Sequence, residues 1–188
     1  MSIKRIFDLS FSVIILILIG LPALLIWIII TIFDKGPLIY WSNRVGKNNI
    51  EFLMPKIRTM KVNTPNVASH LLQDPKNYFT TFGGFLRKYS IDELPQVWSI
   101  FQGKMSFVGP RPALYSQTDL ISLRKLKGVD KVLPGITGWA QINGRDSISI
   151  VDKVLLDTEY LHKKSFFFDL TILWLTFFGV IFKKNISH

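Results

Sequence analysis

The first hydrophobic feature of the chain is an uncharged run near its N-terminus. Residues 9–33 form 25 consecutive positions without a charged side chain, between Asp8 and Asp34. As a straight helix the run would be about 37 Å long at 1.5 Å per residue, which is enough to cross a hydrocarbon core of roughly 30 Å. The pattern therefore predicts a helix that enters a membrane.

The middle and the ends of this run argue against a simple crossing. Gly20 and Pro22 lie near its middle, where proline removes a backbone donor and kinks a helix. Basic residues also flank it on both sides: Lys4 and Arg5 before it, and Lys35, Arg44 and Lys47 after it. Lys and Arg beside a membrane helix are enriched on the cytoplasmic side. Because both ends of this run are basic, this rule does not decide which end lies on that side. On these residues alone, a spanning helix and a bent, re-entrant helix both remain open.

Beyond residue 34 the pattern is that of a folded domain. Two β-prone stretches, 38–42 and 51–58, flank a turn at 46–49. Apolar residues with helical spacing predict helices over 79–87, 91–101, 117–126 and 150–163. A polar stretch over 61–74 indicates a loop or a weakly ordered helix. We therefore expect an α/β fold that is mostly helical, with a small β element.

The last hydrophobic segment, over about 166–182, contains seven aromatic residues. Its uncharged part, 170–182, is 13 residues long and too short to span a bilayer. Lys183 and Lys184 follow it. This pattern is typical of a helix that lies in the membrane interface, although a core helix has the same periodicity.

Composition narrows the class of partner. The chain has 23 Lys and Arg against 13 Asp and Glu, a net charge of +10, and 48% of its residues are hydrophobic. The charge favours nucleic acid, anionic lipid or phosphorylated ligands, and the apolar content favours a membrane surface among them. The absence of cysteine excludes disulfides, thiol nucleophiles and cysteine-bound metals.

The clearest candidate chemistry is an adjacent pair of acids, Asp92 and Glu93, in the sequence SIDELP. One interpretation is a helix cap, in which Ser90 is the N-cap residue and Glu93 completes a capping box. The other is catalytic: one carboxylate attacks an electrophile while the other holds a proton or positions a metal. The two interpretations are compatible, because a capped first turn is a rigid platform.

Basic residues in constrained positions surround this pair in the sequence. Lys56 and Arg58 alternate and are expected on one face of a strand, and Arg87 precedes the acids by about one helical turn. Arg111 stands between two prolines, and Arg145 closes the turn QINGR. Guanidinium groups match phosphate geometry. Each of these residues taken alone is more simply a surface charge, but together they favour a site that handles phosphate.

Longer motifs then identify a family resemblance. In order along the chain they are KRIFD (4–8), NRVG (43–46), KIRTM (56–60), DELPQ (92–96), GKMSFVGPRP (103–112), PGITGWAQINGR (134–145), and Asp157, Tyr160 and FDL (168–170). Together they resemble the bacterial sugar transferases, specifically the small monotopic polyprenyl-phosphate phosphoglycosyl transferases. The resemblance runs over nearly the whole chain, whereas no P-loop, GxGxxG or GxSxG motif occurs.

The resemblance implies a reaction and a set of roles. Such enzymes move a phospho-sugar from a UDP-sugar to undecaprenyl phosphate and release UMP, at the first membrane step of glycoconjugate assembly. Asp92 then corresponds to the nucleophile that forms a covalent phospho-sugar intermediate and helps to bind Mg²⁺, and Glu93 assists. The expected substrate-binding residues are Lys56, Arg58, Arg87, Arg111, Gln141, Asn143 and Arg145, of which Arg87 and Arg111 match phosphate-binding positions of the family.

The resemblance also implies a topology. Residues 1–34 correspond to a re-entrant membrane helix, and 35–188 to a compact cytosolic catalytic domain with an interfacial helix, on the cytoplasmic face of the bacterial inner membrane. The expected anchors are Lys4, Arg5, Asp8 and Pro22, with Leu21 in place of the serine that precedes this proline in the family. Membrane lipid is then a partner, nucleic acid is not, and a homodimer stays open. The alternatives are a basic membrane-associated scaffold without catalytic activity and a nucleic-acid-binding module.

Overall fold

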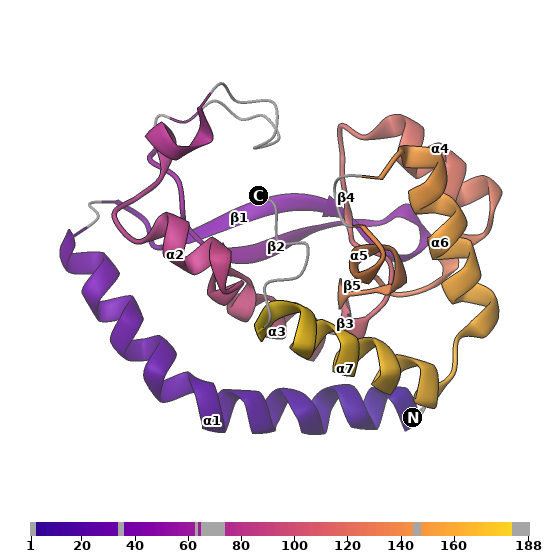
Figure 1. The fold of residues 1–188 in the computed structure, drawn as a ribbon, viewed down its shortest axis with the longest axis horizontal. Coiled ribbons are helices and arrows are strands. Elements are labelled where there is room, and N and C mark those ends of the chain that lie inside the picture. Colours follow the sequence, from indigo (N-terminus) through magenta and orange to yellow (C-terminus); the bar gives the residue numbers. More distant parts are fainter. Residues whose placement is uncertain (1–2, 34–35, 63, 65–73, 145–147, 182–188) are drawn as a thin grey trace.

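The structure is a computed structural model that describes residues 3–33, 36–62, 64, 74–144 and 148–181. As expected, it is mostly helical with two small sheets (Figure 1). The helices and 3₁₀ turns are α1 (Ile3–Phe33), η1 (Lys47–Asn49), η3 (Pro75–Tyr78), α2 (Gly83–Lys88), η4 (Ile91–Gln96), α3 (Val97–Phe101), α4 (Thr118–Leu126), η5 (Val129–Lys131), α5 (Trp139–Ile142), α6 (Ile150–Lys163) and α7 (Phe166–Ile181). The strands are β1 (Ile39–Val45), β2 (Glu51–Ile57), β3 (Ser106–Val108), β4 (Ala113–Leu114) and β5 (Gly135–Thr137).

Helix α1 runs along one side of the molecule and bends near its middle (Figure 1). Gly20 and Pro22 lie in this part of the helix, and Pro22 has no N–H for the helical ladder, so a bend here follows from the sequence. The side chain of Pro22 lies outside the described part of the structure. Among the residues that the structure describes, no helix combines the length and the apolar composition that a membrane crossing needs.

Large apolar side chains are exposed on both α1 and α7. On α1 they include Val13, Ile14, Leu16, Ile17, Leu18, Leu24, Leu25, Trp27 and Ile28. On α7 they are Phe166, Phe167, Leu170, Trp174, Leu175 and Phe177. The opposite side of α7 is buried, because Ile172 belongs to the main core with Tyr160 and Phe107. Helix α7 is therefore a core helix on one side and an exposed apolar helix on the other.

The N-terminal residues expected as membrane anchors attach α1 to the rest of the protein. Lys4 Nζ donates to the carbonyl oxygen of Val108 at 2.9 Å and to Tyr160 Oη at 3.0 Å, and forms an ion pair with Asp169. Arg5 donates to two backbone carbonyl oxygens at the end of α3. These contacts fix the start of α1 against β3, α3, α6 and α7.

Asp8 continues the same attachment one turn further along α1. Its side chain is buried and accepts a hydrogen bond from the backbone N–H of Phe107 at 3.3 Å. The ring of Phe11 packs edge-on against that of Phe107, with centroids 4.9 Å apart. The first turns of α1 are therefore part of the folded core.

The predicted hairpin is present. Strand β1 pairs with β2 in antiparallel register, with Ser42 opposite Met54, and β4 pairs along the other edge of β1. Phe52 and Met54 point into the main core. Lys56 follows on the same face of β2, because side chains two residues apart share a face.

The two Gly/Pro-rich motifs pack backbone against backbone. Strands β3 and β5 pair in parallel, with Val108 opposite Thr137. A Cβ atom on Gly135 would collide with the backbone nitrogen of Gly109, and one on Gly138 with the carbonyl oxygen of Gly109. Only glycine permits this approach, which fixes the position of the loop that starts at Gly109.

Candidate active site

The acid pair lies in η4, and its local structure differs from the predicted cap. Ser90 is the N-cap residue, but it has a left-handed backbone (φ 55°) and its side chain makes no capping hydrogen bond. The capping-box prediction is therefore wrong, because this backbone turn is closed by the Glu93 N–H donating to the carbonyl oxygen of Ser90. The single helix expected over 91–101 is a 3₁₀ turn with Pro95 inside it, followed by the short α3.

Glu93 is the centre of a three-residue ion-pair cluster. Its Oε1 atom accepts from Lys56 Nζ at 2.9 Å and from Arg111 Nη2 at 3.0 Å. The side chains of Lys56 and Glu93 are 14% and 15% exposed, against 39% for Arg111. Glu93 thus holds two cations from β2 and from the loop after β3, and one of them reaches solvent.

The electrostatic surroundings keep Glu93 ionised. Burial alone would raise its pKa, but the charges of Arg111 and Lys56 and their hydrogen bonds outweigh burial and lower the pKa well below its ordinary value. Burial also lowers the pKa of Lys56, an effect that the charge of Glu93 opposes.

Asp92 has the opposite environment. Its residue is 8% exposed, and burial raises the pKa of its carboxyl from 3.8 to about 6. Lys56, Arg87 and Arg111 pull this pKa down, and the negative charge of Glu93 pushes it up. Among the described residues, these cations act on Asp92 through their charge, without a side-chain hydrogen bond to its carboxylate. The Asp92 carboxylate is therefore still able to bind a ligand or attack an electrophile, whereas the Glu93 carboxylate is held by Lys56 and Arg111.

Arg87 flanks the acid pair from α2. Its Nε atom donates to Thr59 Oγ1 at 2.9 Å, and its guanidinium lies over the Phe79 ring, 5.4 Å from the centroid. Helix α2 reaches this place because Gly83 lies so close to the carbonyl oxygen of Thr59 that a Cβ atom would collide with it. Thr59 and Phe79 thus orient the Arg87 guanidinium, whose charge lowers the pKa of Asp92.

The other residues predicted to bind substrate lie away from the acid pair, or their side chains form hydrogen bonds within their own segment of the chain. The guanidinium of Arg58 is next to Gly36, before β1. Gln141 Nε2 donates to the carbonyl oxygen of Ile136 at 2.8 Å, and Asn143 Nδ2 donates to that of Trp139 at 2.8 Å. Arg145 lies outside the described residues. The structure therefore brings together Lys56, Arg87, Asp92, Glu93 and Arg111. The substrate contacts of all the predicted residues stay predictions.

The donor set at Asp92 fits a magnesium ion shared with a substrate. Within the described ranges no three His, Asp or Glu residues gather as a metal-binding group. Mg²⁺ prefers oxygen ligands and is commonly held by one or two carboxylates together with substrate phosphates. Asp92 could supply one such carboxylate, because the ion pairs of Lys56 and Arg111 are formed with Glu93.

Arg124 of α4 is a buried residue that the sequence patterns did not single out. Its guanidinium forms a 2.6 Å ion pair with Asp157 of α6 and donates at 2.8 Å to the carbonyl oxygen of Arg111. A signal was available: Arg124 follows Leu120 by four residues, which puts it on the buried face of the helix. An arginine on that face needs a partner, and Asp157 is the one.

Comparisons with known proteins match this chain to one family. A family model described as bacterial sugar transferase matches residues 1–183. The chain is 37% identical, over all of its length and 92% of the relative's, to a protein of Bacillus subtilis strain 168 named "Uncharacterized sugar transferase EpsL".

Two longer relatives have more specific names. The "UDP-glucose:undecaprenyl-phosphate glucose-1-phosphate transferase" of Escherichia coli K12 is 37% identical over 94% of this chain. The "Undecaprenyl-phosphate glucose phosphotransferase" of Komagataeibacter xylinus is 35% identical over 97% of it. The chain spans only 39% and 36% of these two relatives.

Proposed function

The chain belongs to the bacterial sugar transferase family, and on that premise we propose that it transfers a phospho-sugar from a UDP-sugar to undecaprenyl phosphate, with release of UMP. The observation that carries the proposal is the unequal acid pair: a buried Asp92 beside a Glu93 that is fixed by Lys56 and Arg111. The names of the longer relatives support the substrate classes.

In the first half-reaction the ionised Asp92 carboxylate attacks the β-phosphorus of the UDP-sugar. A bond forms between the carboxylate oxygen and phosphorus, the bond from phosphorus to the bridging oxygen breaks, and UMP leaves with that oxygen. In the second half-reaction a phosphate oxygen of undecaprenyl phosphate attacks the same phosphorus and releases the Asp92 carboxylate. The products are undecaprenyl-diphosphate-sugar and the free enzyme.

The basic residues supply charge where the diphosphate would lie. Arg111 is the most exposed member of the Glu93 cluster, so its guanidinium can donate to a phosphate oxygen while it stays oriented by Glu93. Arg87 adds a second guanidinium near Asp92. A buried cation beside phosphate oxygens stabilises the charge that develops on the leaving group.

A divalent cation completes the charge balance in this proposal. Mg²⁺ bound through Asp92 and substrate phosphates would neutralise the diphosphate and polarise its phosphorus–oxygen bonds. The chain's own residues bind the substrate, orient Asp92 and limit the access of water to it, because Asp92 is only 8% exposed.

We further propose that the protein works at the cytoplasmic face of the bacterial inner membrane, with α1 as a re-entrant helix. The exposed apolar side chains of α1 and α7 support contact with lipid. The bend in α1 and the attachment of its first turns to the core support a helix that returns to the face it entered (Figure 1). A lipid-borne acceptor would then meet Asp92 at the membrane surface.

The experiment that tests this function is transfer by the full chain in lipid nanodiscs or detergent. Purified protein is incubated with undecaprenyl phosphate, Mg²⁺ and each member of a panel of UDP-sugars, and UMP is measured. We expect UMP release with at least one of the UDP-sugars. Release over multiple turnovers should require undecaprenyl phosphate. No release with any sugar, in protein shown to be folded, would overturn the proposal. Asp92→Asn is the matched inactive control.

A further inference from the structure

The loop that carries Arg111 is held by its backbone carbonyl groups. The flanking residues, Pro110 and Pro112, have no backbone N–H to donate. The carbonyl oxygen of Pro110 accepts from the Gly135 N–H at 2.9 Å, and that of Pro112 accepts from Arg44 Nη1 at 3.2 Å. Pro110 and Pro112 are therefore held by hydrogen bonds that other residues donate to their carbonyl oxygens.

The third carbonyl, that of Arg111 itself, is held by a buried guanidinium. Arg124 Nη1 donates to it at 2.8 Å. The remaining donors of Arg124, Nε and Nη2, both reach Asp157 Oδ2, at 2.9 Å and 2.6 Å. Asp157 is 1% exposed and Arg124 is 8% exposed. Asp157 holds two nitrogens of the buried guanidinium, so the third nitrogen, Nη1, is directed towards the carbonyl oxygen of Arg111.

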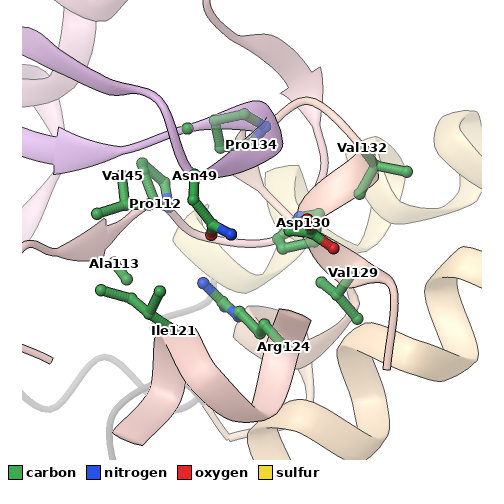
Figure 2. A pocket seen from close by; sticks show the side chains of 12 residues that line it. Val45, Asn49, Pro112, Ala113, Ile121, Arg124, Val129, Asp130, Val132 and Pro134 are labelled. Atoms are coloured by element: carbon green, nitrogen blue, oxygen red, sulfur yellow. The ribbon is translucent and has the colours of Figure 1, made fainter. Parts of the chain in front are cut away.

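Packing alone does not hold this part of the loop. A cavity of about 30 Å³ lies behind it, lined by Pro110, Pro112 and Arg124 among others. Figure 2 shows the Arg124 side chain reaching from α4 towards this cavity, with Pro112 and Asn49 across from it. The hydrogen bond from Arg124 thus holds the Arg111 backbone at a place where side-chain packing is incomplete.

We propose that Arg124 is a positioning residue for Arg111. Resting on the proposed function, the inference is that the Asp157–Arg124 pair fixes the Arg111 backbone so that the Arg111 side chain stays on Glu93 and faces the substrate phosphate. The chain of contacts runs from α6 to α4, to the loop, and to the acid pair in η4. Arg124 itself does not touch substrate.

The first test replaces the pair by apolar residues of similar size, Arg124→Met with Asp157→Leu. Exchanging a buried ion pair for apolar side chains commonly leaves stability unchanged or raised. The variant therefore removes the donor to Arg111 without leaving an unpaired charge. We expect a thermal unfolding midpoint near that of the wild type and a loss of kcat/KM of about tenfold or more, as misplaced groups cost catalysis.

A double-mutant cycle shows whether the loss acts through Arg111. In the Arg111→Ala background there is no guanidinium to position, so the same pair of substitutions should lower kcat/KM by less than about twofold. Losses that multiply independently in the two backgrounds would overturn the inference. Val154→Ala is the control: Val154 is a buried residue of α6 in the cluster with Leu120 of α4 and Ala113 of β4, and its apolar side chain donates no hydrogen bond to the loop. Its variant should unfold earlier with kcat/KM retained.

A readout without turnover separates this inference from the proposed function. The guanidinium NMR signals of Arg111, assigned by their loss in Arg111→Ala, report whether the group is held on Glu93. We expect restricted rotation in the wild type and free rotation in the Arg124→Met/Asp157→Leu variant. Unchanged signals in the variant would overturn the positioning role. If the wild type transfers no phospho-sugar, the proposed function fails and these signals alone decide the role of Arg124.

Discussion

Asp92 and Glu93 are adjacent in the sequence, but their carboxyl groups have opposite pKa shifts. Glu93 shares one oxygen between Lys56 at 2.9 Å and Arg111 at 3.0 Å, which lowers its pKa. Burial raises the pKa of Asp92 to about 6, although the charges of Lys56, Arg87 and Arg111 act to lower it. Two carboxyl groups whose environments separate their ionisation can take two chemical roles. In the proposed mechanism Glu93 is the fixed anion and Asp92 is the reactive group.

The first prediction concerns the pH dependence of transfer. Asp92 must be ionised to attack phosphorus, so kcat/KM of the free enzyme should rise with pH through about 6. In Glu93→Gln the neighbouring negative charge that raises the Asp92 pKa is gone, and the rise should move to lower pH although the maximal rate falls. A wild-type profile that is flat across this range would contradict the assignment of Asp92.

The second prediction concerns stability. The Asp92 pKa is raised in the folded state from 3.8 to about 6, so the folded protein binds this proton more tightly than the unfolded chain does. The free energy of unfolding therefore falls as pH rises through this interval, by up to about 3 kcal/mol. Asp92→Asn cannot ionise and should be more stable than the wild type at pH 7.5, by about 1–3 kcal/mol.

Denaturant unfolding at two pH values measures this difference. Well below pH 3.8, Asp92 is protonated in both the folded and the unfolded state, and the advantage of the Asn variant should shrink towards zero. The same advantage at both pH values would show that the ionisation of Asp92 is not its cause.

The third prediction concerns the shape of the Arg111 side chain. Arg111→Lys keeps the charge but loses the planar fork that can bond Glu93 and a phosphate oxygen together. We expect kcat/KM to fall by about tenfold or more. Lys163→Arg, at the exposed Glu159–Lys163 pair, exchanges the same two residue types and should leave the rate unchanged. An unaltered rate for Arg111→Lys would mean that the Arg111 fork does not bind phosphate and that the residue is only a surface or structural charge.

The fourth prediction concerns the topology of α1. The chain has no cysteine, so Ser2→Cys and Ser187→Cys can each be labelled alone. If α1 is re-entrant, a membrane-impermeant thiol reagent added to intact cells should label neither position, and both should react after lysis. Labelling of position 2 but not of position 187 in intact cells would mean that the helix spans the membrane.

Local patterns predicted the longer elements well. The helices expected over 117–126 and 150–163 are Thr118–Leu126 and Ile150–Lys163, because apolar spacing over several turns identifies a buried face. The hairpin of β1 and β2 and the C-terminal helix are confirmed in the same way. The helix expected over 79–87 begins only at Gly83, and most of the stretch 61–74 lies outside the described residues.

The short strands had no such signal. Strands β3 and β5 are three residues each, and their parallel pairing joins Ser106 to Gly135, segments far apart in the sequence. Their glycines are explained only by the backbone they touch across that pairing. The gathering of Lys56, Glu93 and Arg111 follows from this tertiary arrangement, so the sequence predicted the residues of the cluster and not their contacts.

The most direct measurement of the central claim is the mass of the intact protein after incubation with a UDP-sugar that supports transfer and Mg²⁺, without undecaprenyl phosphate. We predict that part of the wild-type protein gains the mass of one phospho-sugar, that peptide mapping places it on Asp92, and that added undecaprenyl phosphate removes it. Asp92→Asn should gain nothing. Steady UMP release by the wild type without any such adduct, or an adduct that persists in Asp92→Asn, would contradict Asp92 as the nucleophile.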